Sequence, residues 1–196
     1  MKLSESQIKA LVISYFPTLK EEVVNLFLSI TKYQFTKNKE KILKNRKFDK
    51  NVIFILKGVA RAYSINDKGQ ELNDFLRAEG HLMADAKVFG NEIQSLKIES
   101  IGEIHYLKFD ISKLEALGYG NPEIMNFYLD FLKEIILTLS YRLKTFVTMT
   151  PEERYLDLTK WNPILLETTF DKHIASFLGI TPLTIHRIKK RQKDIK

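Results

Sequence analysis

The segment 171–190, DKHIASFLGITPLTIHRIKK, limits more strongly than any other how this chain can fold. Ile174 and Leu178 are four residues apart and therefore share one face of a short helix. The small Ala175 between them leaves room for a second helix to approach. Gly179 then provides a turn, because glycine adopts a positive φ without steric cost. This spacing predicts two short helices joined by a tight turn.

The second of these helices has a start signal, a buried face and a polar outer face. Thr181 is suited to cap its first turn, and Pro182 fits the first helical position. Ile185 and Ile188 face the same small core as the first helix. The remaining side chains form a short polar and basic strip, typical of helices that enter the major groove of DNA: Leu183, Thr184, His186, Arg187 and Lys190. An αα-hairpin without DNA contacts is the alternative.

Positive charge is concentrated in the same part of the chain. The whole chain carries a net charge of +7, of which residues 171–196 contribute +5 and residues 1–170 contribute +2. A basic surface beside a helix-turn-helix favours a polyphosphate partner. The alternative is a solvated C-terminal tail, which would account for the lysines from Lys193 to Lys196.

Composition excludes several classes of site. The chain has no cysteine, which excludes disulfides, cysteine-held iron–sulfur clusters and thiolate zinc sites. The four histidines lack ligand spacing, so no metal site is expected. No phosphate loop, nucleophile–base pair or HExxH motif is present, and we expect no enzyme activity. Without a signal peptide or a run of roughly 18 apolar residues, a soluble cytoplasmic protein without membrane contact is expected.

The N-terminal half changes from helical to β-rich patterns. Ser4 and Thr18, the latter with capping-box spacing to Glu21, are expected to begin two helices within the first thirty residues. Between Tyr33 and Phe109, turn signals such as Lys57-Gly58 separate short β-rich runs, a spacing that suggests a barrel or a sandwich. These runs are Val52–Leu56, Val59–Ile65, Leu72–Leu76 and Ile104–Leu107.

A long amphipathic helix is expected after the cap signal Asn121-Pro122-Glu123. Apolar residues then recur at alternating spacings of four and three, as in a two-stranded coiled coil: Met125, Leu129, Leu132, Ile136, Leu139, Leu143 and Phe146. A second apolar stripe is left to pack on the β-rich part: Ile124, Tyr128, Phe131 and Ile135. This pattern predicts a homodimer seam, and a core helix buried within one chain is the alternative.

A new helix start at Thr150-Pro151-Glu152-Glu153 separates the long helix from the C-terminal segment. A hinge is therefore expected near Met149, and Tyr155 and Trp161 are expected to anchor the core of the last domain. The predicted domains are an effector domain over 1–120, a dimerisation helix over 121–149 and a helix-turn-helix domain over 150–196.

This order, together with the strings Lys57–Tyr63, Glu79-Gly80, Pro151–Tyr155 and Ile174–Arg191, resembles the Crp/Fnr family of bacterial transcription regulators. The resemblance implies an α+β chain with a cyclic-nucleotide-binding-like β-roll, which is a jelly-roll barrel with flanking helices. A long dimerisation helix and a winged-helix-type helix-turn-helix domain would follow. Few residues come after Arg191, so a strand pair at 163–170 is the most of a wing that we expect.

The resemblance also implies a homodimer on double-stranded DNA with a partly palindromic operator, and RNA polymerase as a partner. Arg187 keeps the family's arginine, which can bond guanine O6 and N7, whereas Leu183 could touch a thymine methyl group. Thr181, Thr184 and Lys190 are expected at phosphates. The complete expected DNA-binding set is Thr181, Pro182, Leu183, Thr184, His186, Arg187 and Lys190.

The family's cyclic-nucleotide motif is degraded in this chain. Ala84-Asp85 stands where the family has Gly-Glu, and Gln94 stands where an arginine would pair with the cyclic phosphate, although Ser95 is kept. No cofactor is assigned, and cyclic AMP is not expected, although the sequence leaves it open. An effector pocket would involve His81, Asp85, Lys87, Gln94 and Ser95. The alternative function is a dimeric cyclic-nucleotide or small-ligand sensor whose terminal domain binds a protein.

Overall fold

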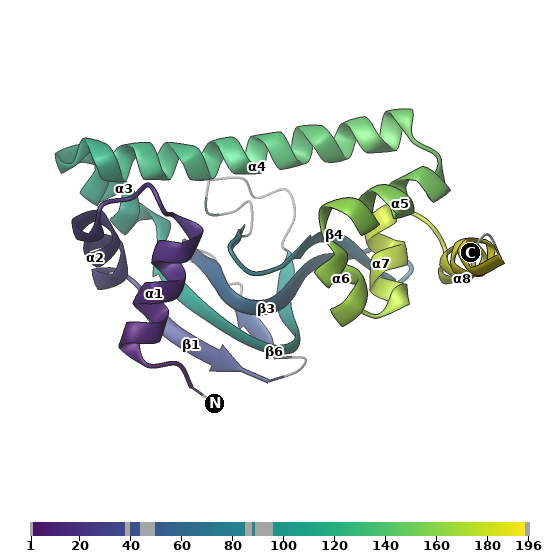
Figure 1. Cartoon of the computed structure of the whole chain (residues 1–196), viewed down its shortest axis with the longest axis horizontal. Helices are drawn as coiled ribbons and strands as arrows, with labels where there is room; N and C mark the ends of the chain where they lie inside the picture. The colour runs from purple at the N-terminus through teal and green to yellow at the C-terminus, as the bar shows by residue number, and fades with distance from the viewer. Residues whose placement is uncertain (1, 38–39, 44–49, 85–87, 89–95, 195–196) are drawn as a thin grey trace.

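The computed structural model describes residues 2–37, 40–43, 50–84, 88 and 96–194 (Figure 1). The N-terminal half holds short helices and a β-sheet, and one long helix runs from there toward a group of short helices at the C-terminus. Within the described ranges, no helix is both long and apolar enough to cross a membrane. The α+β order expected from the sequence is confirmed.

The β-sheet is antiparallel throughout its described pairings. Its strands are β1 (Lys32–Thr36), β2 (Lys41–Leu43), β3 (Asn51–Ile65), β4 (Glu71–Arg77), β5 (Leu82–Ala84) and β6 (Lys97–Asp110). The strand order is β1-β6-β3-β4, with β2 paired to β6 and β5 paired to β3. Because β1 and β4 are opposite edges that do not pair, the described strands form an open sheet. The expected β-rich segment is confirmed, but closure into a barrel is not seen among these strands.

A bulge at Gly58 joins two runs that the sequence separates. Val52–Leu56 and Val59–Ile65 belong to the single strand β3, whose register against β6 shifts on either side of Lys57. Gly58 has a φ of 94°, and a Cβ atom there would lie 2.4 Å from the carbonyl oxygen of Glu103. The Lys57-Gly58 turn signal therefore marks a β-bulge, where the backbone needs glycine, and the chain does not reverse there.

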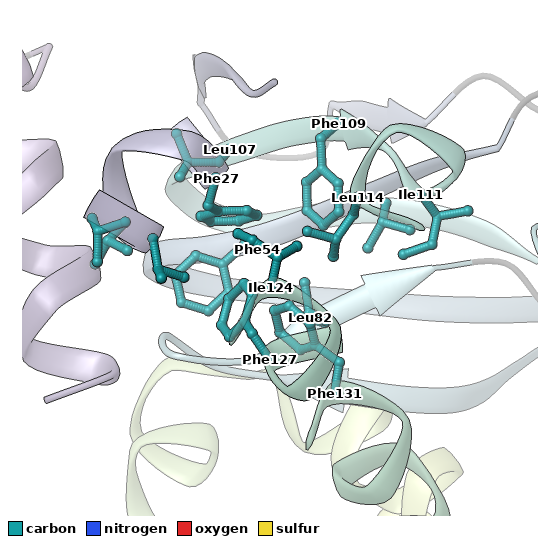
Figure 2. Packing of buried hydrophobic residues seen from close by; sticks show 14 of the residues in the cluster. Phe27, Phe54, Leu82, Leu107, Phe109, Ile111, Leu114, Ile124, Phe127 and Phe131 are labelled. Atoms are coloured by element: carbon teal, nitrogen blue, oxygen red, sulfur yellow. The ribbon is translucent and has the colours of Figure 1, made fainter. Parts of the chain in front are cut away.

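Four helices surround one end of the sheet and share a core with it (Figure 2). They are α1 (Glu5–Tyr15), α2 (Glu21–Ser29), α3 (Ile111–Gly120) and α4 (Pro122–Thr148). The ring of Phe27 in α2 lies edge-on to Phe109 of β6 and to Phe127 of α4, with ring centroids 5.2 Å apart in each pair. Phe54 of β3 joins the same aromatic cluster. This core fixes the start of α4 on the sheet.

The helix starts follow the sequence signals with one exception. Ser4 caps α1 and Asn121 accepts hydrogen bonds from the first turn of α4, as their sequence positions predict. The expected Thr18 cap is wrong, because α2 begins later with Lys20 at its N-cap and without a side-chain bond there. The sequence patterns did not indicate α3.

The α4 helix presents its two apolar stripes in different ways. Ile124 and Phe131 of the inner stripe are 0% and 7% exposed and belong to the core, and Tyr128 packs against it. Along the predicted seam, Ile136 and Leu143 are 63% and 66% exposed in the single chain. The core-helix alternative therefore holds for the inner stripe only, whereas most residues of the outer stripe remain exposed in the single chain.

The C-terminal helices are α5 (Pro151–Trp161), α6 (Pro163–Thr168), α7 (Asp171–Leu178) and α8 (Pro182–Asp194). The expected strand pair at 163–170 is wrong, because Pro163 occupies the first position of α6 and Leu165 is buried in the core of this domain. No strand is found in the described residues from Thr150 to Asp194, so no wing is present within that range.

Tyr155 and Trp161 differ in their burial. Tyr155 is buried in the C-terminal core as expected, but Trp161 is 73% exposed. Trp161 ends α5, and its ring lies beside that of Tyr141 in α4, with centroids 5.7 Å apart. The prediction that Trp161 anchors the core is therefore wrong, because its ring lies outside that core, beside Tyr141 of α4.

Candidate nucleic-acid interface

The turn between α7 and α8 is closed by backbone hydrogen bonds around Gly179. Gly179 has a φ of 65°, its N–H donates to Ser176 O at 3.2 Å, and Ile180 N–H donates to Ala175 O at 2.9 Å. This pair of bonds is a Schellman motif, which ends a helix at a residue in the left-handed conformation. The predicted turn residue therefore has the predicted role.

The start and the buried face of α8 also follow the sequence. The Thr181 hydroxyl accepts a hydrogen bond from Thr184 N at 3.1 Å, which satisfies one of the free N–H groups of the first turn. Ile185 and Ile188 are 0% and 1% exposed and pack with the buried face of α7. These anchors fix which side of α8 faces outward.

The outer face of α8 displays the expected DNA-binding residues. Of the seven, Thr184 is half-buried and the others are exposed: Thr181, Pro182, Leu183, His186, Arg187 and Lys190. Lys189 and Arg191 bind Asp171 and Glu152 at 2.6 and 2.7 Å. Among the described residues, by contrast, Arg187 and Lys190 have no carboxylate partner.

A polar cluster joins the first helix of the motif to the sheet, and the sequence analysis missed it. We call Arg61, Glu71, Asn73, Glu99, His173 and Ser176 the docking cluster. The Arg61 side chain is 4% exposed and pairs with Glu99 at 2.6 Å and with Glu71 at 2.7 Å. Its Nη1 also donates to Asn73 Oδ1 at 3.2 Å. A buried arginine in a strand needs such partners, and the sequence offers no rule that identifies them.

The docking cluster reaches α7 through direct hydrogen bonds. Asn73 N donates to Ser176 Oγ at 2.8 Å, and Asn73 Nδ2 donates to His173 O at 3.0 Å. Arg61 Nη1 donates to His173 Nδ1 at 3.2 Å, which requires that nitrogen to be unprotonated. These hydrogen bonds hold α7, the first helix of the helix-turn-helix, against the sheet. They would be broken if the two parts of the chain separated.

Burial and charge keep His173 neutral. Desolvation, followed by the positive charges of Arg61 and Lys172, lowers the pKa of His173 from 6.5 to about 4, although the negative charges of Glu71 and Glu99 act in the opposite direction. Since the imidazole is neutral at neutral pH, its Nδ1 can accept the bond from Arg61. The contact between the sheet and α7 is therefore intact at neutral pH.

The structure describes only one of the residues expected in an effector pocket. His81 is half-buried, and its Nδ1 lies 3.0 Å from the carbonyl oxygen of Glu79, to which it can donate. Asp85, Lys87, Gln94 and Ser95 lie outside the described residues. Between the sheet and α4 there is an apolar cavity of about 200 Å³, and Arg77 is the only charged residue among its described lining.

Comparison with known proteins finds similar solved structures, but no match to a protein-family model or to a curated sequence. FixK2 from Bradyrhizobium japonicum superposes with a TM-score of 0.67 at 15% identity, over 84% of this chain and 85% of that one.

Two further solved structures agree with it. The c-di-GMP-responsive global regulator CLP from Xanthomonas campestris gives a TM-score of 0.63 at 13% identity, covering 89% of this chain and 93% of that one. A protein of Eubacterium rectale, described as a transcriptional regulator of the Crp/Fnr family, gives 0.65 at 14% identity, covering 92% and 88%. At such identities the likeness is one of fold, and the chain has the fold of Crp/Fnr-type regulators.

Proposed function

We propose that this chain is a DNA-binding transcriptional regulator of the Crp/Fnr type. The observation that carries the proposal is α8, whose buried Ile185 and Ile188 hold Arg187 and Lys190 outward, without carboxylate partners among the described residues. Two exposed cations without partners on a rigid helix suit a phosphate backbone and a base edge. The fold of the solved regulators supports the same function.

In this proposal each side chain of the α8 surface has a defined role. Arg187 reads guanine through O6 and N7, and Leu183 touches a thymine methyl group. Lys190 and the hydroxyl groups at the start of α8, Thr181 and Thr184, contact phosphates and set the position of the helix. Pro182 and His186 complete the surface that faces the groove.

We further propose a homodimer that uses the outer stripe of α4 as its seam. The exposed fractions of Leu129, Leu139 and Phe146 are 42%, 44% and 40%, and Met125 and Leu132 are half-buried. A continuous apolar stripe of this kind favours a second copy of the same helix, because pairing removes it from water. Two α8 helices would then meet half-sites about one helical turn apart.

The proposed division of labour follows the domain order. Residues 1–120 would sense an effector, 121–149 would pair the subunits, and 150–196 would read a partly palindromic operator in the cytoplasm, with RNA polymerase as a partner. The chain would have no catalytic role. The degraded nucleotide motif argues against cyclic AMP as the effector.

Selection of bound sequences from a random duplex pool, with and without cyclic AMP, tests this function. We expect enrichment of a two-fold symmetric site by the wild-type chain and loss of the preference at one position in each half-site for Arg187→Ala. Equal recovery of all sequences by both proteins would contradict sequence-specific reading. Retention of a protein partner with no duplex affinity would favour the alternative, a sensor whose terminal domain binds protein.

Sedimentation at micromolar concentration tests the seam. The proposal predicts a dimer of the wild-type chain. A monomer under those conditions would refute the homodimer, whatever the result of the duplex selection.

A further inference from the structure

We propose that the cavity between α4, β4 and the C-terminal domain binds a small aromatic anion. This interdomain cavity has a volume of about 790 Å³ and is lined by residues of both domains. Ligand sites in proteins commonly have volumes of roughly 300–1,000 Å³ and occur at domain interfaces. The inference concerns a ligand, and it holds whether or not α8 binds DNA.

The charge of the cavity wall is the first reason. The charged side chains of the lining are four cations and two carboxylates: Arg77, Arg142, Lys144, Arg154, Glu134 and Asp157. Among the described residues Glu134 is the only carboxylate bonded to any of the three arginines, 3.2 Å from Arg77, and Asp157 accepts a hydrogen bond from the Tyr141 hydroxyl. Arg142 donates to the carbonyl oxygens of Asn73 and Phe177. Arg154 likewise donates to the carbonyl oxygens of Leu178 and Met149. Carbonyl groups bind these guanidinium ions without cancelling their charge.

Arg61, the buried arginine of the docking cluster, provides a comparison for Arg77. Arg61 is 3% exposed and is bonded to two carboxylates, whereas Arg77 is 8% exposed and has one. A guanidinium has five N–H donors, of which Arg77 uses one toward described protein groups. The Arg77 side chain is also part of the lining of the cavity. Arg77 therefore has donors available for a ligand.

Electrostatics at the wall point the same way. Burial lowers the pKa of Arg142 most; the negative charge of Asp74 raises it, and the positive charge of Arg77 lowers it by a smaller amount. Burial also lowers the pKa of Arg77, while Glu134 raises it. An anion near the two guanidinium groups would stabilise their charged forms, which burial disfavours, in a wall where water screens charge weakly.

Aromatic side chains set the rest of the ligand's chemistry. Phe75, Phe177, Tyr141 and Trp161 line the cavity, and Arg142 lies over the ring of Phe177 at 4.4 Å. Flat aromatic walls favour a flat apolar body, and the guanidinium groups favour a single anionic head that accepts two hydrogen bonds. We therefore expect an aromatic carboxylate, with an aromatic phosphodiester as the competing source of the same chemistry.

Trp161 provides a direct readout, because it is the only tryptophan of the chain and lies on the cavity wall. The full-length protein is titrated with phenylpropionate, with its neutral amide, and with cyclic AMP as the phosphodiester arm, and Trp161 emission and the melting temperature are recorded. We expect a saturable change with phenylpropionate, and at least tenfold weaker binding of the amide. Tighter binding of cyclic AMP than of phenylpropionate would overturn the assignment to carboxylates.

Two kinds of variant separate ligand binding from folding. Arg77→Met should weaken phenylpropionate tenfold or more, since it removes a charge-assisted pair. If that variant does not fold, Leu137→Glu serves in its place, because Leu137 lines the cavity and is 68% exposed. Asn126→Glu adds the same charge on the exposed side of the same helix and should bind like wild type. Unchanged affinity in Leu137→Glu, or no saturable signal in wild type, overturns the inference.

Discussion

Replacing His173 by asparagine should make the chain less sensitive to acid. In the folded protein the pKa of His173 is lowered from 6.5 to about 4, mainly by burial and then by Arg61. Between pH 6.5 and about pH 4, His173 binds a proton in the unfolded chain but not in the folded chain, so folding stability falls as the pH decreases. The stability contributed by the neutral imidazole is complete above pH 6.5 and is lost by about pH 4.

The size of the effect follows from the difference between the folded and the unfolded pKa of His173. A tenfold difference in proton affinity corresponds to about 1.36 kcal/mol, so the whole window is worth about 3 kcal/mol. At pH 5, which lies about 1.5 pH units below the ordinary pKa, wild type should have lost about 2 kcal/mol through this group. Asparagine cannot titrate, and its carbonyl oxygen can still accept from Arg61. His173→Asn should therefore lack this loss.

Urea denaturation at pH 7 and pH 5 measures the difference. The free energy of unfolding of wild type should fall by about 2 kcal/mol more than that of His173→Asn. His186→Asn, on the exposed face of α8, is the matched control and should fall by as much as wild type. Equal losses in wild type and His173→Asn would refute the account of a buried neutral histidine in the docking cluster.

Three other substitutions test separate parts of the structure. Arg187→Ala should lower affinity for a selected duplex by roughly 1–3 kcal/mol and flatten the preference at one base pair, measured by competition against random duplex; equal losses on both duplexes would mean that Arg187 contacts phosphate only. Leu143→Glu should shift the sedimentation of the chain from dimer to monomer, and an unchanged dimer would contradict the seam on α4. Gly58→Ala should cost roughly 1–3 kcal/mol of stability in urea denaturation, because a Cβ at that positive φ meets Glu103 O at 2.4 Å. Gly102 also has a positive φ, but a Cβ atom there would meet open space, so Gly102→Ala should cost less stability. Equal losses of stability in the two variants would show that the clash with Glu103 is not the cause.

Local signals in the sequence were sufficient for most helices. Thr181, Gly179 and the isoleucines of α8 act over a few residues, and the helix pair they predict is found with the expected cap and turn. Asn121 and the apolar spacing predicted α4 for the same reason. Propensity and capping are short-range effects, and tertiary packing does not override them at these positions.

Features that depend on distant partners could not be predicted in this way. From the local sequence alone, Gly58 looks like a turn residue. Its pairing partner is β6, which includes Glu103 and is distant in sequence, and this pairing shows that β3 continues through Gly58. The docking cluster joins Arg61 to His173, which are separated by 112 positions, and no local pattern pairs them. A strand pair at 163–170 was the most of a wing that the sequence led us to expect, whereas Pro163, after the N-cap Asn162, begins α6 in this chain.

The salt dependence of duplex affinity, compared between wild type and Lys190→Ala, tests the central claim most directly. A dimer that places both α8 helices on DNA neutralises one phosphate per Lys190, and each neutralised phosphate contributes about −0.9 to the slope of log K against log salt. The account therefore predicts a steep negative slope in wild type and a slope shallower by about 2 in Lys190→Ala. A wild-type slope near zero, or the same slope in both proteins, would contradict a paired recognition helix on DNA.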